Sequence, residues 1–173
     1  KNSNTWTDSA AETIRSGKKM IKIVGIDPGL AGTGIGVLEG DPVQIIRYSF
    51  GSIATRSDQP TPFRLTTIYT RIYDFLTEQV PDFVVIEDMY SLEKYPKSGI
   101  MLGKVSGVLQ VAACRAGIQV EEIAVREAKK IISGNGNADK VQMERAVRHL
   151  LNHPDPIRPF HASDALALAI TGY

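Results

Sequence analysis

The sequence is poor in the features that would give a protein a covalent framework or a membrane anchor. Its 173 residues include a single cysteine, Cys114, so no disulfide can form within the chain. No stretch approaches the ~20 apolar residues that a membrane-spanning helix needs, and the first residues lack the apolar core of a secretory signal. We therefore expect a soluble, cytoplasmic protein in which Cys114, set among apolar helical residues, belongs to the core.

Net charge is also nearly absent, but its distribution is uneven. The chain carries a formal charge of +1, whereas residues 94–148 hold ten Lys and Arg against five Asp and Glu. The remainder is therefore net acidic. This asymmetry is compatible with a polyanion bound by one region and a metal-binding acidic site in another, although a solvated helical surface is the commoner cause of a basic excess.

The length of the chain suits one ordinary domain with a core of its own. Residues 1–19 are polar and irregular, and we interpret them as a tag remnant or a disordered extension. The pattern of a folded domain begins at Met20. Residues 20–173 are therefore expected to form a single domain.

The order of apolar patterns predicts a mixed α/β fold. Three strands suited to an antiparallel meander come first, and two later strands are separated by helices. A five-stranded sheet with three antiparallel strands, then two parallel ones, and helices on both faces fits this order. The expected strands are Met20–Ile26, Thr33–Glu39, Val43–Phe50, Phe83–Ile86 and Ile118–Val125, and the expected helices are a first one capped by Thr61 and ended by Pro81, then Gly99–Ala116, Arg126–Ile132, Ala138–Leu151 and Phe160–Ile170.

The first expected strand ends in an acid followed by a glycine-rich turn. Asp27 precedes Pro28-Gly29, and the glycines of residues 29–36 are expected to supply the positive φ of a tight return into the second strand. By itself Asp27 could simply begin a turn, because Asp-Pro-Gly is common turn chemistry. Whether it is instead a presented acid depends on the other carboxylates of the chain.

Two further acids occupy comparable places. Glu87 ends the fourth expected strand, and Asp164 lies in the first turns of the last helix, on the same face as His161 three residues earlier. If the first and fourth strands are parallel neighbours, Asp27 and Glu87 emerge at one edge of the sheet. Carboxylates held close together repel each other, and a divalent cation normally neutralises such a group, with Mg²⁺ or Mn²⁺ favoured over zinc by oxygen ligands.

This set of residues suits phosphodiester hydrolysis by two metal ions, which activate water and stabilise charge on the phosphate. Other catalytic machinery is not evident in the sequence. Cys114 lies in an apolar setting, and His149 and His153 have no triad partners by pattern. The glycines of residues 29–36 match neither a P-loop nor a dinucleotide-binding fingerprint.

A helix with regularly spaced glycines offers a candidate interface. Gly99, Gly103 and Gly107 are four residues apart and share one helix face, although each glycine costs a helix about 1 kcal/mol relative to alanine. Close approach of another backbone is the natural reason for this cost. The approaching element is either the sheet of the same chain or a helix across a dimer axis.

Five segments, taken in order, together resemble a known family over about residues 20–172. The segments are Gly25-Ile26-Asp27-Pro28-Gly29, Val85-Ile86-Glu87, Leu102-Gly103 with Gly107, the loop Gly134 to Lys140, and His161-Ala162-Ser163-Asp164-Ala165-Leu166-Ala167. They look like those of RuvC-type Holliday-junction resolvases. The resemblance implies an RNase H-like fold, a homodimer, and Mg²⁺-dependent paired nicking of four-way DNA junctions, and it suggests a branch-migration complex as a further partner. The helix with Gly99, Gly103 and Gly107 is the expected contact of that homodimer.

The resemblance also implies roles for individual residues. The family's four metal-site positions fall on Asp27, Glu87, His161 and Asp164. Tyr90 falls on an aromatic position that stacks on bases near the junction centre. Lys129 and Lys140 fall on basic positions near the cleaved phosphate, with Lys140 counted among the catalytic residues; for both lysines a solvated helix surface is the alternative.

The sequence departs from the family pattern at two positions. Many members carry aspartate in place of His161 and arginine in place of Ser106. We expect the helix N-terminus to keep the His161 ring neutral and able to bind metal, and Lys104 to replace the missing phosphate contact. The segment from Asp88 to Ile100 is also about one residue longer than usual, which affects the reach of Tyr90.

Two alternative functions remain open from the sequence. An ATP-dependent phosphotransferase of the actin and sugar-kinase type shares the Gly-Ile-Asp-x-Gly pattern, but that fold needs two such domains. A DNA-junction-binding protein of the same fold without catalysis is the other alternative, prompted by His161 and Ser106.

Overall fold

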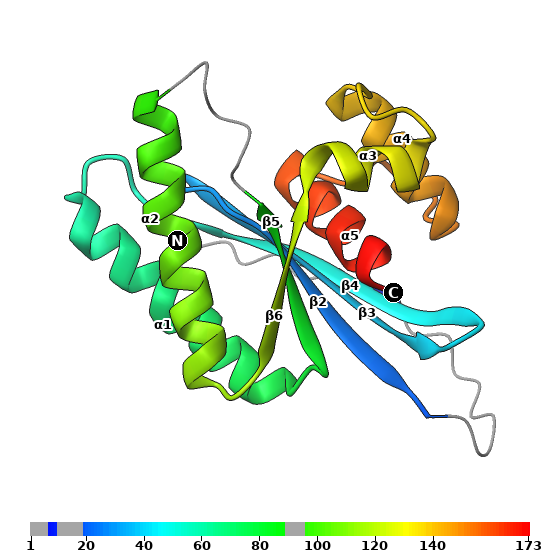
Figure 1. The fold of residues 1–173 in the computed structure, drawn as a ribbon, viewed down its shortest axis with the longest axis horizontal. Coiled ribbons are helices and arrows are strands. Elements are labelled where there is room, and N and C mark those ends of the chain that lie inside the picture. The colour runs from blue at the N-terminus through cyan, green and yellow to red at the C-terminus, as the bar shows by residue number, and fades with distance from the viewer. Residues whose placement is uncertain (1–6, 10–18, 89–95) are drawn as a thin grey trace.

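A mixed sheet of six strands runs through the protein in the order β1-β4-β3-β2-β5-β6 (Figure 1). In this computed structural model, which describes residues 7–9, 19–88 and 96–173, β2, β3 and β4 form an antiparallel meander, while β2, β5 and β6 run parallel. The predicted five-stranded mixed sheet is confirmed. The strands are β1 (Thr7–Ser9), β2 (Ile21–Asp27), β3 (Gly32–Asp41), β4 (Gln44–Ala54), β5 (Phe83–Asp88) and β6 (Gln119–Ala124), and the helices are α1 (Thr61–Gln79), α2 (Pro96–Arg115), α3 (Val125–Ser133), α4 (Lys140–Leu150) and α5 (Phe160–Gly172).

The sixth strand, β1, was not expected from the sequence. Its three residues pair antiparallel with the outer edge of β4, with Thr7 opposite Phe50 and Ser9 opposite Tyr48. Three polar residues are too few to show the alternation by which a strand is recognised. The addition leaves the order of the other five strands unchanged.

Helices cover both faces of the sheet, as predicted (Figure 1). α1 and α2 pack on one face, whereas α5, together with α3 and α4, packs on the other. β2 is apolar on both sides for this reason: Val24 and Ile26 belong to the core under α1 and α2, and Ile23 belongs to the core under α5. β2 is therefore buried between the helices that cover the two faces of the sheet.

Glycines on β2 and β3 allow α5 to lie directly against the sheet backbone. A Cβ atom at Gly25 would lie 2.1 Å from the carbonyl oxygen of Ala165, and one at Gly34 would lie 1.9 Å from that of His161. The positive φ predicted for the glycines of residues 29–36 is wrong, since none of them has one. These glycines provide space for a helix rather than turn geometry.

Two local predictions are also wrong. α1 begins without a side-chain cap, and Pro60, not Thr61, occupies the capping position. Cys114 is exposed, because α2 turns Ala112 and Ala113 toward the sheet instead. The apolar neighbours of Cys114 in the sequence did not reveal which side of the helix faces inward.

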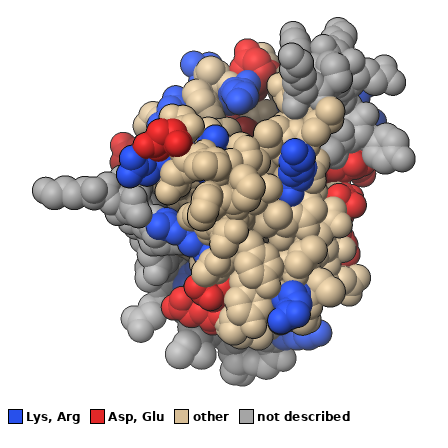
Figure 2. Space-filling view, turned by 90° about the vertical axis from the view of Figure 1, so that its left-hand side faces the viewer, with Lys and Arg blue, Asp and Glu red and all other residues tan. Residues whose placement is uncertain are grey.

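The glycine-bearing side of α2 faces away from the sheet. Gly103 and Gly107 are exposed, and a Cβ atom on either would meet nothing within 4 Å. Packing of this stripe against the chain's own sheet is therefore excluded. Figure 2 shows that uncharged side chains occupy most of the centre of this face of the molecule.

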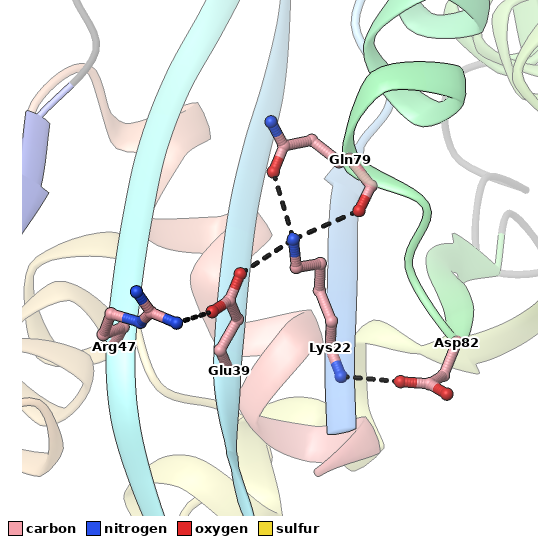
Figure 3. Close-up of polar contacts among 5 residues, drawn as sticks. All are labelled: Lys22, Glu39, Arg47, Gln79 and Asp82. Atoms are coloured by element: carbon pink, nitrogen blue, oxygen red, sulfur yellow. Dashed lines mark hydrogen bonds and ion pairs between the residues drawn. The ribbon is translucent and has the colours of Figure 1, made fainter. Parts of the chain in front are cut away.

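A polar network ties the start of β2 to its neighbours (Figure 3). The ammonium of Lys22 lies 2.8 Å from Glu39 on β3 and donates to the backbone carbonyl of Gln79 at the end of α1. Glu39 also pairs with Arg47 on β4 at 2.9 Å, and the backbone amide of Lys22 donates to Asp82 before β5. The network thus joins three strands and a helix at the opposite end of β2 from Asp27.

None of the helices in the described part of the chain is long and apolar enough to span a membrane.

Candidate active site

The three acids singled out in the sequence line one cavity. Asp27 is the last residue of β2 and Glu87 the penultimate residue of β5, and these parallel strands are paired in register at Ile26 and Ile86. The two carboxylates therefore leave the sheet at the same edge. The N-terminal part of α5 brings Asp164 there from the other side. The cavity has a volume of about 340 Å³ and is lined by Asp27, Pro28, Gly29, Glu87, Leu102, Val125, Ala128, Lys129, Lys140, Met143, His161, Asp164, Ala167 and Leu168.

Asp27 is held by a direct contact with α5. Its Oδ2 atom lies 2.7 Å from Nδ1 of His161, and the Asp27 side chain is only 10% exposed. The His161 side chain is 41% exposed, so the rest of the ring remains accessible from the cavity. This hydrogen bond joins the sheet half of the site to its helix half.

The pKa values of Glu87 and Asp164 are raised by burial and by neighbouring negative charge. Burial raises the pKa of Glu87 from an ordinary 4.5 to about 8, and the charge and hydrogen bond of Asp27 contribute to this rise, as does the charge of Asp164. Burial, followed by the charge of Asp27, raises the pKa of Asp164 from 3.8 to about 6. The charge of Asp27 therefore makes ionisation of both Glu87 and Asp164 harder, and that of Asp164 adds to the effect on Glu87.

Two lysines supply positive charge to the same cavity. Lys129 on α3 lowers the pKa values of both Glu87 and Asp164, and Lys140 at the start of α4 lowers that of Asp164. Both ammonium groups are therefore close enough to the acids to interact with them. The family resemblance implies a place near the cleaved phosphate for these two lysines, and both line the cavity that holds the acids.

The pKa of His161 shifts in the direction opposite to the one expected. We expected the N-terminus of α5 to keep the ring neutral, but the hydrogen bond to Asp27 raises its pKa above the ordinary 6.5, with burial acting in the opposite direction. The contact with a carboxylate outweighs the helix end because it is direct and only partly exposed to solvent.

The donor set suits a divalent metal by its chemistry. Within the described part of the chain, no three His, Cys, Asp or Glu side chains already converge as a preformed metal cluster. Three buried or half-buried carboxylates nevertheless share one cavity, where the charge of Asp27 raises the pKa values of both Glu87 and Asp164, a repulsion that a cation would relieve. Carboxylate oxygens with one imidazole are ligands for Mg²⁺ or Mn²⁺.

One wall of the cavity is apolar, and this was not foreseen. Leu102 of α2, Val125 of α3, Met143 of α4 and Leu168 of α5 line it beside the acids. Met143 shows why the sequence does not predict this wall: an apolar residue at helical spacing is normally assigned to the core. Only the packing of four helices around one strand edge reveals that these side chains border the acids.

The other positions considered for DNA contact are Lys104, Ser106 and Tyr90. Lys104 lines a groove between α1 and α2, not the acid cavity. Ser106 is buried, with its hydroxyl 3.4 Å from the amide nitrogen of Gln110, so this position cannot present a phosphate contact. Tyr90 lies outside the described residues.

Comparison with known proteins places these features in a family. The model of the family described as "Crossover junction endodeoxyribonuclease RuvC" matches residues 23–172. The chain is 36% identical over 148 residues to a protein of that name from Citrifermentans bemidjiense, and the match covers 86% of this chain and 89% of the relative. It is 38% identical over 152 residues to one from Yersinia enterocolitica, with 88% and 86% covered.

Solved structures give the same result for the fold. A Thermus thermophilus RuvC structure superposes with a TM-score of 0.75 at 29% identity, covering 87% of this chain and 92% of the other. A structure of T. thermophilus RuvC in complex with a Holliday junction substrate superposes with a TM-score of 0.77 at 28% identity and the same coverage.

Proposed function

Because the chain belongs to the RuvC family of crossover junction endodeoxyribonucleases, we propose that it resolves four-way (Holliday) DNA junctions by paired symmetrical nicks in recombination and repair. Its fold is the RNase H-like fold of that family. The ATP-dependent phosphotransferase considered from the sequence is set aside by this membership.

The observation that carries the proposal is the acid cavity. Asp27, Glu87 and Asp164 meet at one strand edge with two lysines facing them. Such a cavity combines ligands for a hard cation with positive charge for an anionic substrate. Phosphodiester hydrolysis with a divalent metal needs both.

The residues of the cavity have separate roles in this proposal. Asp27, Glu87 and Asp164 hold the metal through carboxylate oxygens, and His161 either ligates it or positions the attacking water. Mg²⁺, or Mn²⁺ in its place, supplies charge stabilisation at the phosphate and activates water when bound. Lys140 and Lys129 bind the phosphate oxygens and orient the strand to be cut.

Paired nicks need two such cavities, and we propose that a homodimer provides them. The groove between α1 and α2 is lined by Leu65, Tyr69 and Val111 around the open surface of Gly103 and Gly107. Val111 is 54% exposed. An exposed apolar strip beside glycines allows the helix of a second copy to approach closely.

Substitution of the metal-holding acids tests the reaction. We expect Asp27→Asn and Asp164→Asn to lower cleavage of a labelled mobile four-way junction by at least about 100-fold with Mg²⁺, since effects of 10- to 100-fold already follow the loss of outer partners of a metal. Junction binding in a gel shift should persist. Asp58→Asn is the matched control, because Asp58 is exposed in the loop before α1.

The same assay distinguishes a junction-cleaving enzyme from a protein that only binds junctions. Cleavage at the wild-type rate by either variant would contradict the assigned site. Binding by the wild type without cleavage in Mg²⁺ or Mn²⁺ would identify a non-catalytic junction-binding protein, an alternative prompted by His161. Nicks placed symmetrically on opposite strands support both the reaction and the dimer.

A further inference from the structure

A second basic cavity lies at the far end of α4 from the acids. It has a volume of about 460 Å³ and is lined by Arg145, Arg148, His149, Asn152 and His153. We call it the distal basic pocket. Among the described residues, those that line it include no Asp or Glu, so its charge is positive.

Arg148 is positioned for this pocket by a buried acid. Its Nε atom lies 3.2 Å from the carboxylate of Glu144, one turn earlier on α4, near enough for an ion pair but not aligned for a hydrogen bond. Glu144 is buried and also accepts the backbone amide of Ile157 at 2.9 Å. The stem of Arg148 is thus fixed, while its side chain remains 31% exposed and lines the pocket.

His153 is likewise held at one nitrogen and open at the other. Its Nδ1 atom lies 2.8 Å from the hydroxyl of Tyr48, and its ring packs edge-on against Phe50 at 5.6 Å between centroids. The tautomer that accepts the Tyr48 proton carries its own proton on Nε2. That N–H is a donor for an anion in the pocket.

The pocket is more than a set of charges that complement the helix dipole. Basic residues in the last turn of a helix stabilise its C-terminus, and Arg148 and His149 do so here. That effect requires neither a cavity nor Arg145, which precedes the last turn, nor His153, which follows the helix. Two guanidiniums and two imidazoles around one hollow are a donor set for phosphate oxygens.

The position of the pocket suits the backbone of DNA beyond the cut. Lys140, in the acid cavity, and Arg148 are eight residues apart on α4, which corresponds to about 12 Å along the helix and about 80° around it. At 3.4 Å per nucleotide, this spans roughly three to four nucleotides. α4 lies across the sheet from α1 and α2 (Figure 1), so the pocket lies away from the proposed dimer face.

We propose that the distal basic pocket binds a backbone phosphate of the duplex arm, roughly three to four nucleotides from the cleaved bond. This inference rests on the proposed junction-resolving function. The pocket holds the arm outside the catalytic cavity and takes no part in the reaction. It recognises phosphate and is therefore indifferent to base sequence.

The test uses the exposed members of the pocket, because Arg148 and His153 also hold other residues. We expect Arg145→Gln with His149→Gln to weaken binding to a four-way junction roughly threefold to tenfold, and to lower the dependence of log Kd on log salt by about 1 for each phosphate that the variant no longer binds. The cleavage rate at saturating protein should be unchanged. Arg115→Gln, at an exposed arginine in the last turn of α2, is the matched control.

A neutral methylphosphonate placed singly at each of the first several linkages of one arm locates the bound phosphate. We expect one position to weaken wild-type binding but not binding by the double variant, because that variant does not bind the phosphate there. If the double variant binds as Arg115→Gln does, or is weakened as much as the wild type at every methylphosphonate, the pocket does not bind the arm. Cleavage of the junction by the wild type is read separately and decides the proposed function, and a wild type that binds no junction overturns both.

Discussion

At the scale of single residues, the candidate site is an arrangement of groups that resist ionisation together. Glu87 is the clearest case, because burial and Asp27 raise its pKa to about 8. An acid with this pKa carries its proton at neutral pH until a cation displaces it. Binding of metal and loss of protons are therefore coupled in this cavity.

The coupling predicts how stability changes with pH in the protein treated with a chelator. Glu87 and Asp164 have folded-state pKa values of about 8 and about 6, both above the ordinary 4.5 and 3.8. The folded state therefore binds more protons, and its stabilisation is complete below about pH 4 and is lost as pH rises toward 8. We expect these groups to lower the free energy of unfolding by on the order of 3 kcal/mol between pH 5 and 8, measured by urea denaturation.

A matched variant and added metal check the cause. Glu87→Gln should remove most of this slope, since the amide does not titrate, and saturating Mg²⁺ should restore stability at pH 8 in the wild type only. A slope that is the same in Glu87→Gln and the wild type would show that other groups produce it.

At the scale of helices and strands, the sequence was sufficient for five of the six strands of the described sheet but not for β1 or for the contacts between layers. The apolar run ending in Asp27 and its repetition before Glu87 predicted two strands that end in acids, and these acids share one edge on the condition that the strands are parallel neighbours. The structure meets that condition. The exposed position of Cys114 was missed, because an all-apolar stretch of helix carries no period that distinguishes its faces. The apolar wall at Met143 was missed because it arises from tertiary packing alone.

The close packing of α5 on the glycines of β2 and β3 is another contact between layers that the sequence did not predict, and it can be tested directly. Gly34→Ala should destabilise the protein by about 3 kcal/mol or more and abolish cleavage, because its Cβ would overlap the carbonyl oxygen of His161 at 1.9 Å. The measurement is the denaturant midpoint at constant m-value together with the junction assay.

Gly103→Ala is the control for this change. Within one chain a Cβ there meets nothing within 4 Å, and alanine is favoured over glycine in a helix by about 1 kcal/mol, so we expect a small gain in the free energy of unfolding of the monomer, with any effect on the proposed subunit contact read separately by light scattering. Equal destabilisation by both substitutions would refute the account of close packing between α5 and the sheet.

At the scale of the whole molecule, the face of α1 and α2 predicts the oligomeric state. Gly107→Arg should convert a dimer to a monomer in light scattering and abolish paired nicking, because the new side chain occupies the surface on which a second copy would pack. The monomer should remain folded, since the position is exposed and helical.

Val43→Arg provides the comparison. Val43 is 77% exposed at the turn between β3 and β4, so the same new side chain should leave the dimer intact. A dimer that survives Gly107→Arg unchanged would place the subunit interface elsewhere.

The sheet also separates a surface that tolerates substitution from one that does not. One core, under α1 and α2, lies behind the proposed subunit contact, and the other, under α5, lies behind the helix that carries His161 and Asp164. The strands lie between these two cores. Substitutions on the outer face of α2 therefore do not disturb the contacts under α5 that place His161 and Asp164. The proposed subunit contact can thus change while the packing that places the acids stays constant, whereas the glycines beneath α5 cannot change without displacing the helix that carries His161 and Asp164.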